Sequence, residues 1–245
     1  RDSQKSLTGF VDKLSMIPLR FDPGTNWCYS LATDVCGALV EIISGQSFSE
    51  FLGDRIFEPL DMSDTSFTIS DEKVPRLAAN YERDQDKNLV LIDDPVESIY
   101  ANTRRLQSGG GGLLSTTADY AKFCEMLLGG GKYNGCRIIG DRTLKMMCQN
   151  HLPMNADLAS VAMGSFSETA YEGVGFGLGF ASTLSEVNAH NLGEGDFYWG
   201  GMASTIFWVD PRESMFCVFM TQLVPSGTFN FRGQLKSIVY SSIED

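Results

Sequence analysis

The chain has 245 residues, of which 43% are hydrophobic and 20% charged, and its formal net charge is -12 with an isoelectric point near 4.6. These proportions are typical of a soluble globular protein. The acidic balance argues against a nucleic acid as partner, because an acidic surface repels phosphate backbones. No apolar run approaches the roughly 20 residues that span a bilayer, so we expect no membrane partner either.

The N-terminal residues predict a helix over Lys5–Leu14, with apolar side chains at helical spacing. The chain opens at Arg1, without an initiator Met and almost inside this helix. We therefore expect an earlier segment to precede it, and any targeting signal would lie there. Localisation is left open, with a slight preference for the cytoplasm.

Two further helices follow the turn at Phe21–Gly24. The first runs from about Thr33 to Ser44, has an apolar stripe of Val35, Ala38, Leu39, Ile42 and Ile43, and is followed by Gly45, which suits the position just past a helix end. Ser47–Glu50 reads as a capping box for the second, which Pro59 ends. Both helices need a shared core, so we expect them to pack together.

The middle of the chain alternates between irregular and helical stretches. Residues from about 65 to 107 show weak periodicity and are interpreted as mostly irregular connection with a few short elements. Gly109–Gly112 interrupts the chain, and Ser115–Thr117 then begins a helix that stops at Gly129–Gly131. Another short helix is expected around Arg142–Gln149.

The last third is rich in aromatic and β-branched residues, which favour strands. The predicted strands are Gly175–Thr183, Asp196–Trp199, Ala203–Val209 and Met215–Leu223. A terminal amphipathic helix is expected over Phe231–Ile243, with Leu235, Ile238, Val239 and Ser242 on one face. Helices first (about 1–170), then an antiparallel sheet with a terminal helix (about 171–245), is the order of an α+β fold.

Metal and nucleotide chemistry find little support. The six cysteines form no CxxC pair, and His151 and His190 lie far apart without ligand spacing, so we expect no metal. Neither histidine has a G-x-S-x-G elbow to serve, and both are interpreted as structural. The glycines at 109–112 and at 173, 175 and 177 lack the context of a phosphate-binding loop, so no cofactor is expected.

Two short segments remain as candidates for chemistry: Tyr29-Ser30-Leu31 before a helix, and Trp199-Gly200-Gly201-Met202 between two predicted strands. Each alone has a structural explanation, as a Tyr after a turn and as a glycine pair at a strand junction. Their significance comes from the series of motifs in which they stand.

That series resembles the serine β-lactamase-like superfamily, closest to family VIII carboxylesterases, which are relatives of class C β-lactamases. The motifs are Phe21-Asp22-Pro23-Gly24 before Tyr29, Phe57–Phe67 (FEPLDMSDTSF), Ser108–Thr116 (SGGGGLLST), Tyr198–Gly201, Phe207–Pro211 and Phe219–Gln222. The resemblance covers nearly the whole chain. It implies one incomplete domain over residues 1–245 with the β-lactamase/transpeptidase-like fold, an antiparallel sheet flanked by helices plus a mainly helical region.

The resemblance also implies roles. Tyr29 would share general base and acid work with the Lys of a Ser-x-x-Lys motif, and the backbone N–H of Met202 would be an oxyanion donor. Leu31, Trp199, Gly200 and Gly201 would bind substrate, a small-molecule ester or amide. Class C enzymes have an Asn in place of Leu31 and a Lys in place of Trp199. These apolar replacements favour an uncharged ester over a β-lactam.

The nucleophile itself is missing. In the family, Ser-x-x-Lys precedes the Tyr motif, whereas the one match here, Ser70-Asp71-Glu72-Lys73, follows Tyr29 in a polar stretch. We therefore expect the nucleophile helix and the first strands of the sheet to be absent from this sequence, and the isolated fragment to be inactive. The missing segment could be present as a separate chain. Two alternatives stay open: a penicillin-recognising β-lactamase or D-Ala-D-Ala peptidase, and a non-catalytic homologue that binds.

Overall fold

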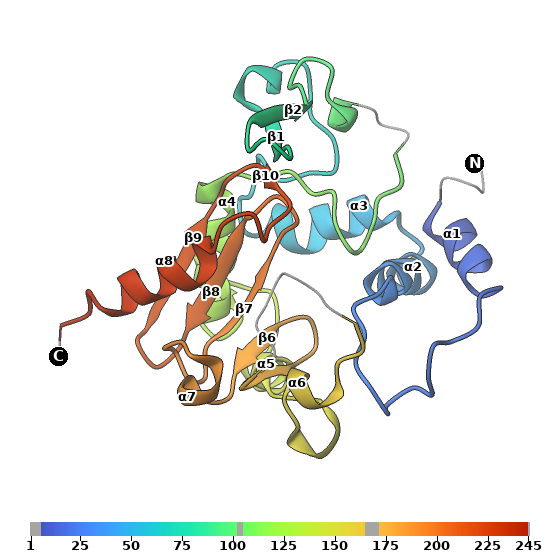
Figure 1. Ribbon diagram of the computed structural model, residues 1–245. Helices are drawn as coiled ribbons and strands as arrows, with labels where there is room; N and C mark the ends of the chain where they lie inside the picture. Colours follow the sequence, from blue (N-terminus) through green and yellow to red (C-terminus); the bar gives the residue numbers. More distant parts are fainter. Residues whose placement is uncertain (1–5, 102–104, 165–171, 245) are drawn as a thin grey trace.

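A computed structural model describes residues 6–101, 105–164 and 172–244 (Figure 1). The helices are α1 (Leu7–Leu14), α2 (Ala32–Ser44), α3 (Phe48–Leu52), α4 (Thr117–Leu128), α5 (Asp141–Cys148), α6 (Leu158–Val161), α7 (Glu186–Ala189) and α8 (Phe231–Tyr240). A π-helical turn follows α3 at Gly53–Phe57, and 3-10 turns lie at Val74–Arg76, Ile99–Ala101 and Pro153–Asn155. Within these ranges no helix is both long and apolar enough to cross a bilayer.

The strands form three sheets. They are β1 (Asn80–Arg83), β2 (Leu89–Asp93), β3 (Lys132–Tyr133), β4 (Cys136–Arg137), β5 (Val174–Phe176), β6 (Ala181–Thr183), β7 (Phe197–Gly200), β8 (Ile206–Asp210), β9 (Met215–Phe219) and β10 (Leu223–Val224). The largest sheet is antiparallel in the order β5-β6-β7-β8-β9, and a smaller one has the order β10-β1-β2. Strands β3 and β4 pair as a short hairpin.

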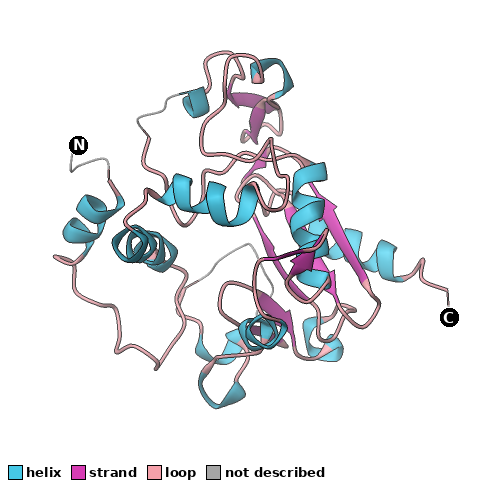
Figure 2. Cartoon of the chain, turned by 180° about the vertical axis from the view of Figure 1, so that it is seen from behind, coloured by secondary structure: helices cyan, strands magenta, loops and turns pink. Residues whose placement is uncertain are grey.

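The large sheet carries the core on both of its faces. Strand β8 shows why: alternate side chains of a strand point to opposite faces, so Ile206 and Trp208 pack on one face and Phe207 and Val209 on the other. Leu235 and Val239 of α8 cover the first face. Helix α4 covers the second, and Figure 2 shows it on the side of the sheet opposite α8.

Local sequence signals fix several helix ends as predicted. The Ser47 side chain accepts the Glu50 N–H while Glu50 caps the Ser47 N–H, so the predicted capping box is present at the start of α3. The Thr116 side chain caps α4 by accepting the Asp119 N–H, and Gly45 closes α2 with φ of 72°, a left-handed conformation that glycine adopts without strain. Helices α2 and α3 pack together, as expected.

One strand prediction was wrong, and one stretch of expected short elements contains a hairpin. The expected single strand at 175–183 is a hairpin of β5 and β6, because the chain turns through Gly177 and Gly179. A Cβ at Gly177 would lie 2.1 Å from the Met147 carbonyl oxygen. The 65–107 stretch, interpreted as mostly irregular connection with a few short elements, contains the β1–β2 hairpin, whose strands the sequence did not locate. Its second strand exposes Leu89–Ile92 on both faces, so no alternation of apolar and polar residues marks it.

Two predicted apolar stripes are only partly buried. In α2 Ala38 is buried, but Leu39, Ile42 and Ile43 are 49%, 64% and 83% exposed among the described residues. The terminal helix ends at Tyr240 rather than Ile243, and its Ile238 faces solvent.

Candidate active site

The structure brings the two candidate segments together. The rings of Tyr29 and Trp199, 170 positions apart in the chain, stack with centroids 6.0 Å apart and an interplanar angle of 21°. Trp199 lies near the end of β7, and Tyr29 lies just before α2. Leu31 is the N-cap residue of α2 and is exposed on the same short segment as Tyr29. The two motifs therefore meet at one place, as the resemblance implied.

Backbone hydrogen bonds hold the Tyr29 segment. The N–H of Trp27 donates to Val161 O at 3.0 Å, and the N–H of Met163 donates to Trp27 O at 2.8 Å. The Ser30 hydroxyl then accepts the Ala32 N–H at 3.2 Å where α2 begins. Tyr29 is thus fixed between a β-bridge and a helix start while 46% of its surface remains exposed.

The turn between β7 and β8 presents the predicted oxyanion donor. Gly201 N–H donates to Thr205 O and Ser204 N–H donates to Gly201 O, each at 3.0 Å. Ser204 has φ of 69°, and its buried hydroxyl donates to Leu223 O at 2.6 Å. These bonds close the turn tightly and leave Met202 at its tip, 70% exposed.

Arg232, in the first turn of α8, reinforces the same turn and was missed from the sequence. Its Nη2 donates to Gly201 O at 2.9 Å and to Thr205 O at 3.1 Å. A Cβ at Gly200 would lie 2.5 Å from this Nη2, so glycine at 200 lets the guanidinium approach the strand. Arg232 thereby positions the backbone on both sides of Met202. A lone Arg in a terminal helix gives no sequence signal for such a role.

The glycine run 109–112 serves close packing against α2. A Cβ at Gly109 would lie 2.1 Å from the Thr33 carbonyl oxygen, which leaves room for glycine alone. Beside it, the Ser108 hydroxyl donates to the carboxylate of Asp34, which is buried in α2. This loop therefore fixes the start of α2, directly after Tyr29. Asp34 and Ser108 are further supporting residues that sequence reasoning missed.

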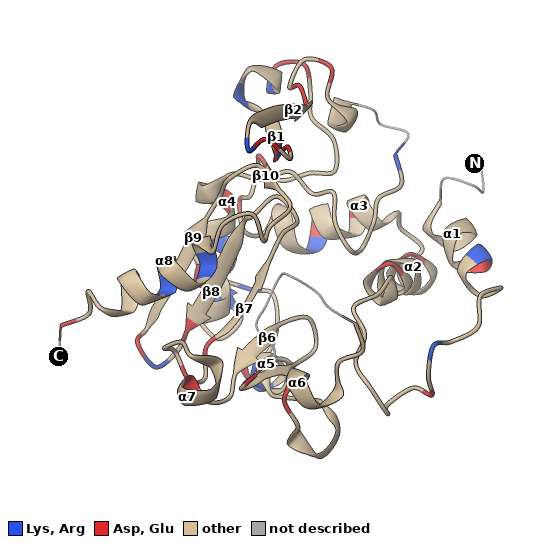
Figure 3. Cartoon of the chain, viewed as in Figure 1, with Lys and Arg blue, Asp and Glu red and all other residues tan. Residues whose placement is uncertain are grey.

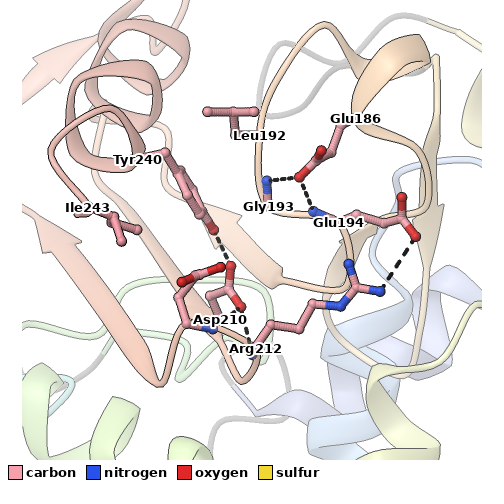
Figure 4. Close-up of a pocket in the computed structure, with 9 residues that line it drawn as sticks. Glu186, Leu192, Gly193, Glu194, Asp210, Arg212, Tyr240 and Ile243 are labelled. Carbon is pink, nitrogen blue, oxygen red and sulfur yellow. Dashed lines mark hydrogen bonds and ion pairs between the residues drawn. The ribbon is translucent and has the colours of Figure 1, made fainter. Parts of the chain in front are cut away.

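A buried polar network joins α8 to the sheet, and Figure 4 shows its hydrogen bond between Tyr240 and Asp210. Lys236 forms an ion pair with Asp196, which precedes β7, and its Nζ lies 4.7 Å from the centre of the Tyr198 ring. The Tyr240 hydroxyl donates to Asp210 at 2.6 Å and contacts Asp196 at 3.3 Å. Burial raises the pKa of Asp196 against the opposing effect of Lys236. Burial, followed by the hydrogen bond to Asp210, raises the pKa of Tyr240.

This network sets where Arg232 lies. A broken buried ion pair leaves an uncompensated charge in the interior, which is strongly destabilising. Lys236 is one helical turn beyond Arg232 on α8, so the Lys236–Asp196 pair fixes the helix against β7. The cavity beside the network, about 230 Å³, is lined by Glu186, Glu194, Arg212 and Tyr240 among others and lies apart from the Tyr29–Trp199 contact.

The lysine of the Ser70–Lys73 match to Ser-x-x-Lys is paired with surface residues. Lys73 Nζ ion-pairs with Asp64 at 2.9 Å and donates to Ser63 O at 2.7 Å. Hydrogen bonds from Arg76 and then Lys73 hold the pKa of the Asp64 carboxyl well below its usual range. This lysine is therefore engaged in a surface ion-pair cluster, as expected for a loop residue.

Neither the two histidines nor the charged residues of the described chain indicate a second catalytic or metal site. His151 Nε2 makes a hydrogen bond with Met146 O at 2.8 Å, and His190 is an exposed helix-ending residue with φ of 50°. In the part of the chain that the structure describes, no group of three or more His, Cys, Asp or Glu residues could hold a metal ion. Charged residues are scattered over the molecule (Figure 3).

A family model described as "Beta-lactamase" matches residues 2–237. The lovastatin esterase of Penicillium rubens is 30% identical over 219 residues, covering 84% of this chain and 53% of that protein. Protein Rv1367c of Mycobacterium tuberculosis is 29% identical over 216 residues, covering 86% and 52%. The chain thus spans about half the length of the curated relatives it matches.

Solved structures agree on the fold. "EstCE1, a hydrolase with promiscuous acyltransferase activity" superimposes with a TM-score of 0.79 at 26% identity, covering 96% of this chain and 61% of that one. A variant of simvastatin synthase (LovD) from Aspergillus terreus gives 0.75 at 21% identity, covering 98% and 63%, which shows a shared fold alone.

Proposed function

The chain belongs to the beta-lactamase family, and from that membership we propose that it is the acid–base and substrate-binding part of an ester-acting serine hydrolase. The α+β fold of the β-lactamase and transpeptidase type, predicted from the sequence, is confirmed by the family match and the structural neighbours. The observation that carries the functional proposal is the stacking of Tyr29 on Trp199 beside the turn that holds Met202.

The proposed reaction runs through an acyl-enzyme. The Tyr29 phenolate accepts the proton of a serine hydroxyl as the serine oxygen attacks the ester carbonyl, whose oxygen becomes negatively charged and accepts the Met202 N–H. Collapse of this intermediate expels the alcohol, which takes the proton from Tyr29. Water then repeats the sequence and releases the acid. A free phenol has a pKa near 10, and a neighbouring ammonium group lowers it toward useful values.

The serine and that ammonium would come from a Ser-x-x-Lys segment outside these 245 residues. Two observations support this: Lys73 of the only internal match is paired with Asp64, and Leu39, Ile42 and Ile43 present an exposed apolar surface on α2, the helix that follows the Tyr29 segment. We call this chain together with such a segment, covalently joined or as a second polypeptide, the complemented enzyme. The chain alone is expected to be inactive.

An ester substrate is favoured by the side chains at the two motifs. Leu31 and Trp199 offer neither an amide nor a positive charge, the groups with which class C enzymes hold a β-lactam. Burying a substrate carboxylate beside them would cost free energy without a compensating partner. The 30% identical lovastatin esterase is an ester-acting relative by its name.

The experiment is hydrolysis of short-chain p-nitrophenyl esters by the complemented enzyme. Tyr29→Phe is expected to lower kcat/KM by about 10²-fold or more, the lower end of what general acid–base groups contribute. Full activity of this variant would overturn the assignment. Covalent labelling by a fluorescent penicillin with no ester turnover would support the β-lactamase or peptidase alternative instead. Ester binding without any acylation would support a non-catalytic homologue.

Acyl transfer to an alcohol is the second candidate, because the structural neighbour EstCE1 is described as a hydrolase with promiscuous acyltransferase activity. The same acyl-enzyme would be attacked by an alcohol in place of water. Adding a primary alcohol during turnover separates the two activities: new ester supports acyl transfer, and free acid alone supports hydrolysis.

A further inference from the structure

Four aromatic side chains form a closed cycle of contacts around Tyr29. Trp27 lies 6.4 Å from Tyr29 and 5.2 Å from Phe176, measured between ring centroids. Trp199 completes the cycle, stacked on Tyr29 at 6.0 Å and meeting Phe176 edge-on at 5.4 Å and 80°. We call these four residues the aromatic cluster. It joins the Tyr29 segment, β5 and β7 at the place where the two motifs meet.

The cluster is held by the backbone. Trp27 is fixed by the bridge to the end of α6. Phe176 donates its N–H to the Asn150 side chain at 3.1 Å and accepts the His151 N–H at 2.8 Å. Trp199 is held in register opposite Phe207 of β8. Because the rings are already held in place, a ligand that stacks on them would cause little further loss of side-chain conformational entropy.

The rings keep accessible surface. Trp208, a core side chain of the same sheet, is completely buried, whereas Tyr29 is 46% exposed and Trp27, Phe176 and Trp199 are only partly buried. Neighbouring Leu31 is exposed as well. Trp27, Phe176 and Trp199 also pack against the buried core of the sheet, so the cluster lies at the edge of the core and remains apolar and partly open.

The backbone segments that carry the aromatic cluster contain no charged residues. The residues that carry its rings, 26–31, 174–180 and 199–202, include no Asp, Glu, Lys or Arg. Aromatic pairs in stacked or edge-on geometry contribute beyond their buried area, and an apolar surface disfavours a charged group that it cannot pair. Both effects select a flat, uncharged ring.

We propose that the aromatic cluster is a subsite for an uncharged aryl or fused-ring group of the ester substrate. The proposal rests on the proposed function, since it places that group beside the base Tyr29. Trp27 and Phe176 are its specificity-determining residues: they belong to neither motif, Trp27 contacts the ring of Tyr29, and Phe176 contacts the ring of Trp199. A trimethylammonium group is the competing ligand, because aromatic residues also bind such cations.

The test is binding, measured by ligand-observed NMR titration of the 245-residue chain. Methyl 2-naphthoate and 2-naphthyl acetate carry the ring on the acyl and alcohol sides; each is compared with its cyclohexyl counterpart. At least one naphthyl ester is expected to bind about fivefold more tightly than its counterpart, within the range of one aromatic pair. Equal affinities for both pairs, or tighter binding of acetylcholine than of either naphthyl ester, would overturn the proposal.

Variants locate the site. Trp27→Leu and Phe176→Leu are expected to weaken naphthyl binding about fivefold, while Trp27→Phe, which keeps a ring, retains most of it. Phe229→Leu is the matched control, because Phe229 belongs to a separate ring group with Phe231. Circular dichroism checks folding, and undiminished binding by both folded Leu variants contradicts the proposal. Binding needs no turnover, so the two proposals can fail separately. Naphthyl binding without ester hydrolysis by the complemented enzyme refutes only the proposed function. Ester hydrolysis without preferential naphthyl binding refutes only the subsite.

Discussion

Replacing Arg232 separates its effect on the proposed oxyanion donor, the Met202 N–H, from its effect on the stability of the fold. In Arg232→Met the two hydrogen bonds to Gly201 O and Thr205 O are lost. Neither carbonyl is left without a partner, since Ser204 N–H still donates to Gly201 O and Gly201 N–H to Thr205 O. The free energy of unfolding should therefore fall by only about 1–2 kcal/mol, close to the net value of one or two ordinary hydrogen bonds.

The expected loss of kcat is larger, relative to the effect of losing the donor entirely, than the expected loss of stability. Removing an oxyanion donor outright costs about 10²–10³ in kcat. The Met202 N–H remains in Arg232→Met and only its direction loosens, so we expect kcat of the complemented enzyme to fall about tenfold to a hundredfold. KM should change little, because the donor acts on charge that develops in the transition state. Arg232→Lys, which keeps one donor group, should fall between.

The assay is kcat and KM for p-nitrophenyl butyrate, with urea unfolding of the isolated chain alongside. Arg212→Met is the matched control, because Arg212 forms a surface ion pair with Glu194 at 3.6 Å and makes no hydrogen bond to Gly201 or Thr205 in the described structure. An Arg232→Met variant that loses stability but keeps its kcat would refute the positioning role. So would an equal loss of kcat in the Arg212 control.

Three further outcomes are expected. Gly109→Ala, whose Cβ would meet a backbone carbonyl of α2 at 2.1 Å, should lower the unfolding free energy by about 1–3 kcal/mol, while Gly111→Ala, with open space, should leave it unchanged or slightly raised in urea titrations. Burial and the hydrogen bond to Asp210 raise the pKa of Tyr240 in the folded chain, so the stability that Tyr240 contributes is present below about pH 10, the pKa of a free phenol, and is lost progressively above it. The free energy of unfolding, measured from pH 8 to 11, should therefore decline less steeply in Tyr240→Phe than in the parent chain. Ile43→Asp, on an exposed apolar position of α2, should leave the chain's stability unchanged but weaken reconstitution of activity with a separate Ser-x-x-Lys segment; unchanged reconstitution would argue against docking there.

Signals that act within one turn of chain were predictable. The Ser47–Glu50 capping box and the left-handed Gly45 needed only local chemistry, and both are present. The pairing of Tyr29 with Trp199 was accessible only through the resemblance, because nothing in either segment encodes contact across 170 positions.

The rest depended on tertiary context. Strand β2, one of the short elements expected between residues 65 and 107, could not be located because Leu89–Ile92 is exposed on both faces, so no period of two marks it. Lys236 is buried on α8 while Ile238 is exposed, since an ion pair with Asp196 outweighs hydropathy there. Arg232 was missed for a similar reason: its partners are backbone carbonyls, which leave no trace in the sequence.

The most direct test of the account is the site of acylation. The complemented enzyme would be quenched during turnover of p-nitrophenyl butyrate, and intact-mass measurement with peptide mapping would locate any butyryl group. The account predicts one butyryl group on the serine of Ser-x-x-Lys, with much less accumulating in Tyr29→Phe. A butyryl group on Ser70, or turnover with no acyl-enzyme that survives in any variant, would contradict it.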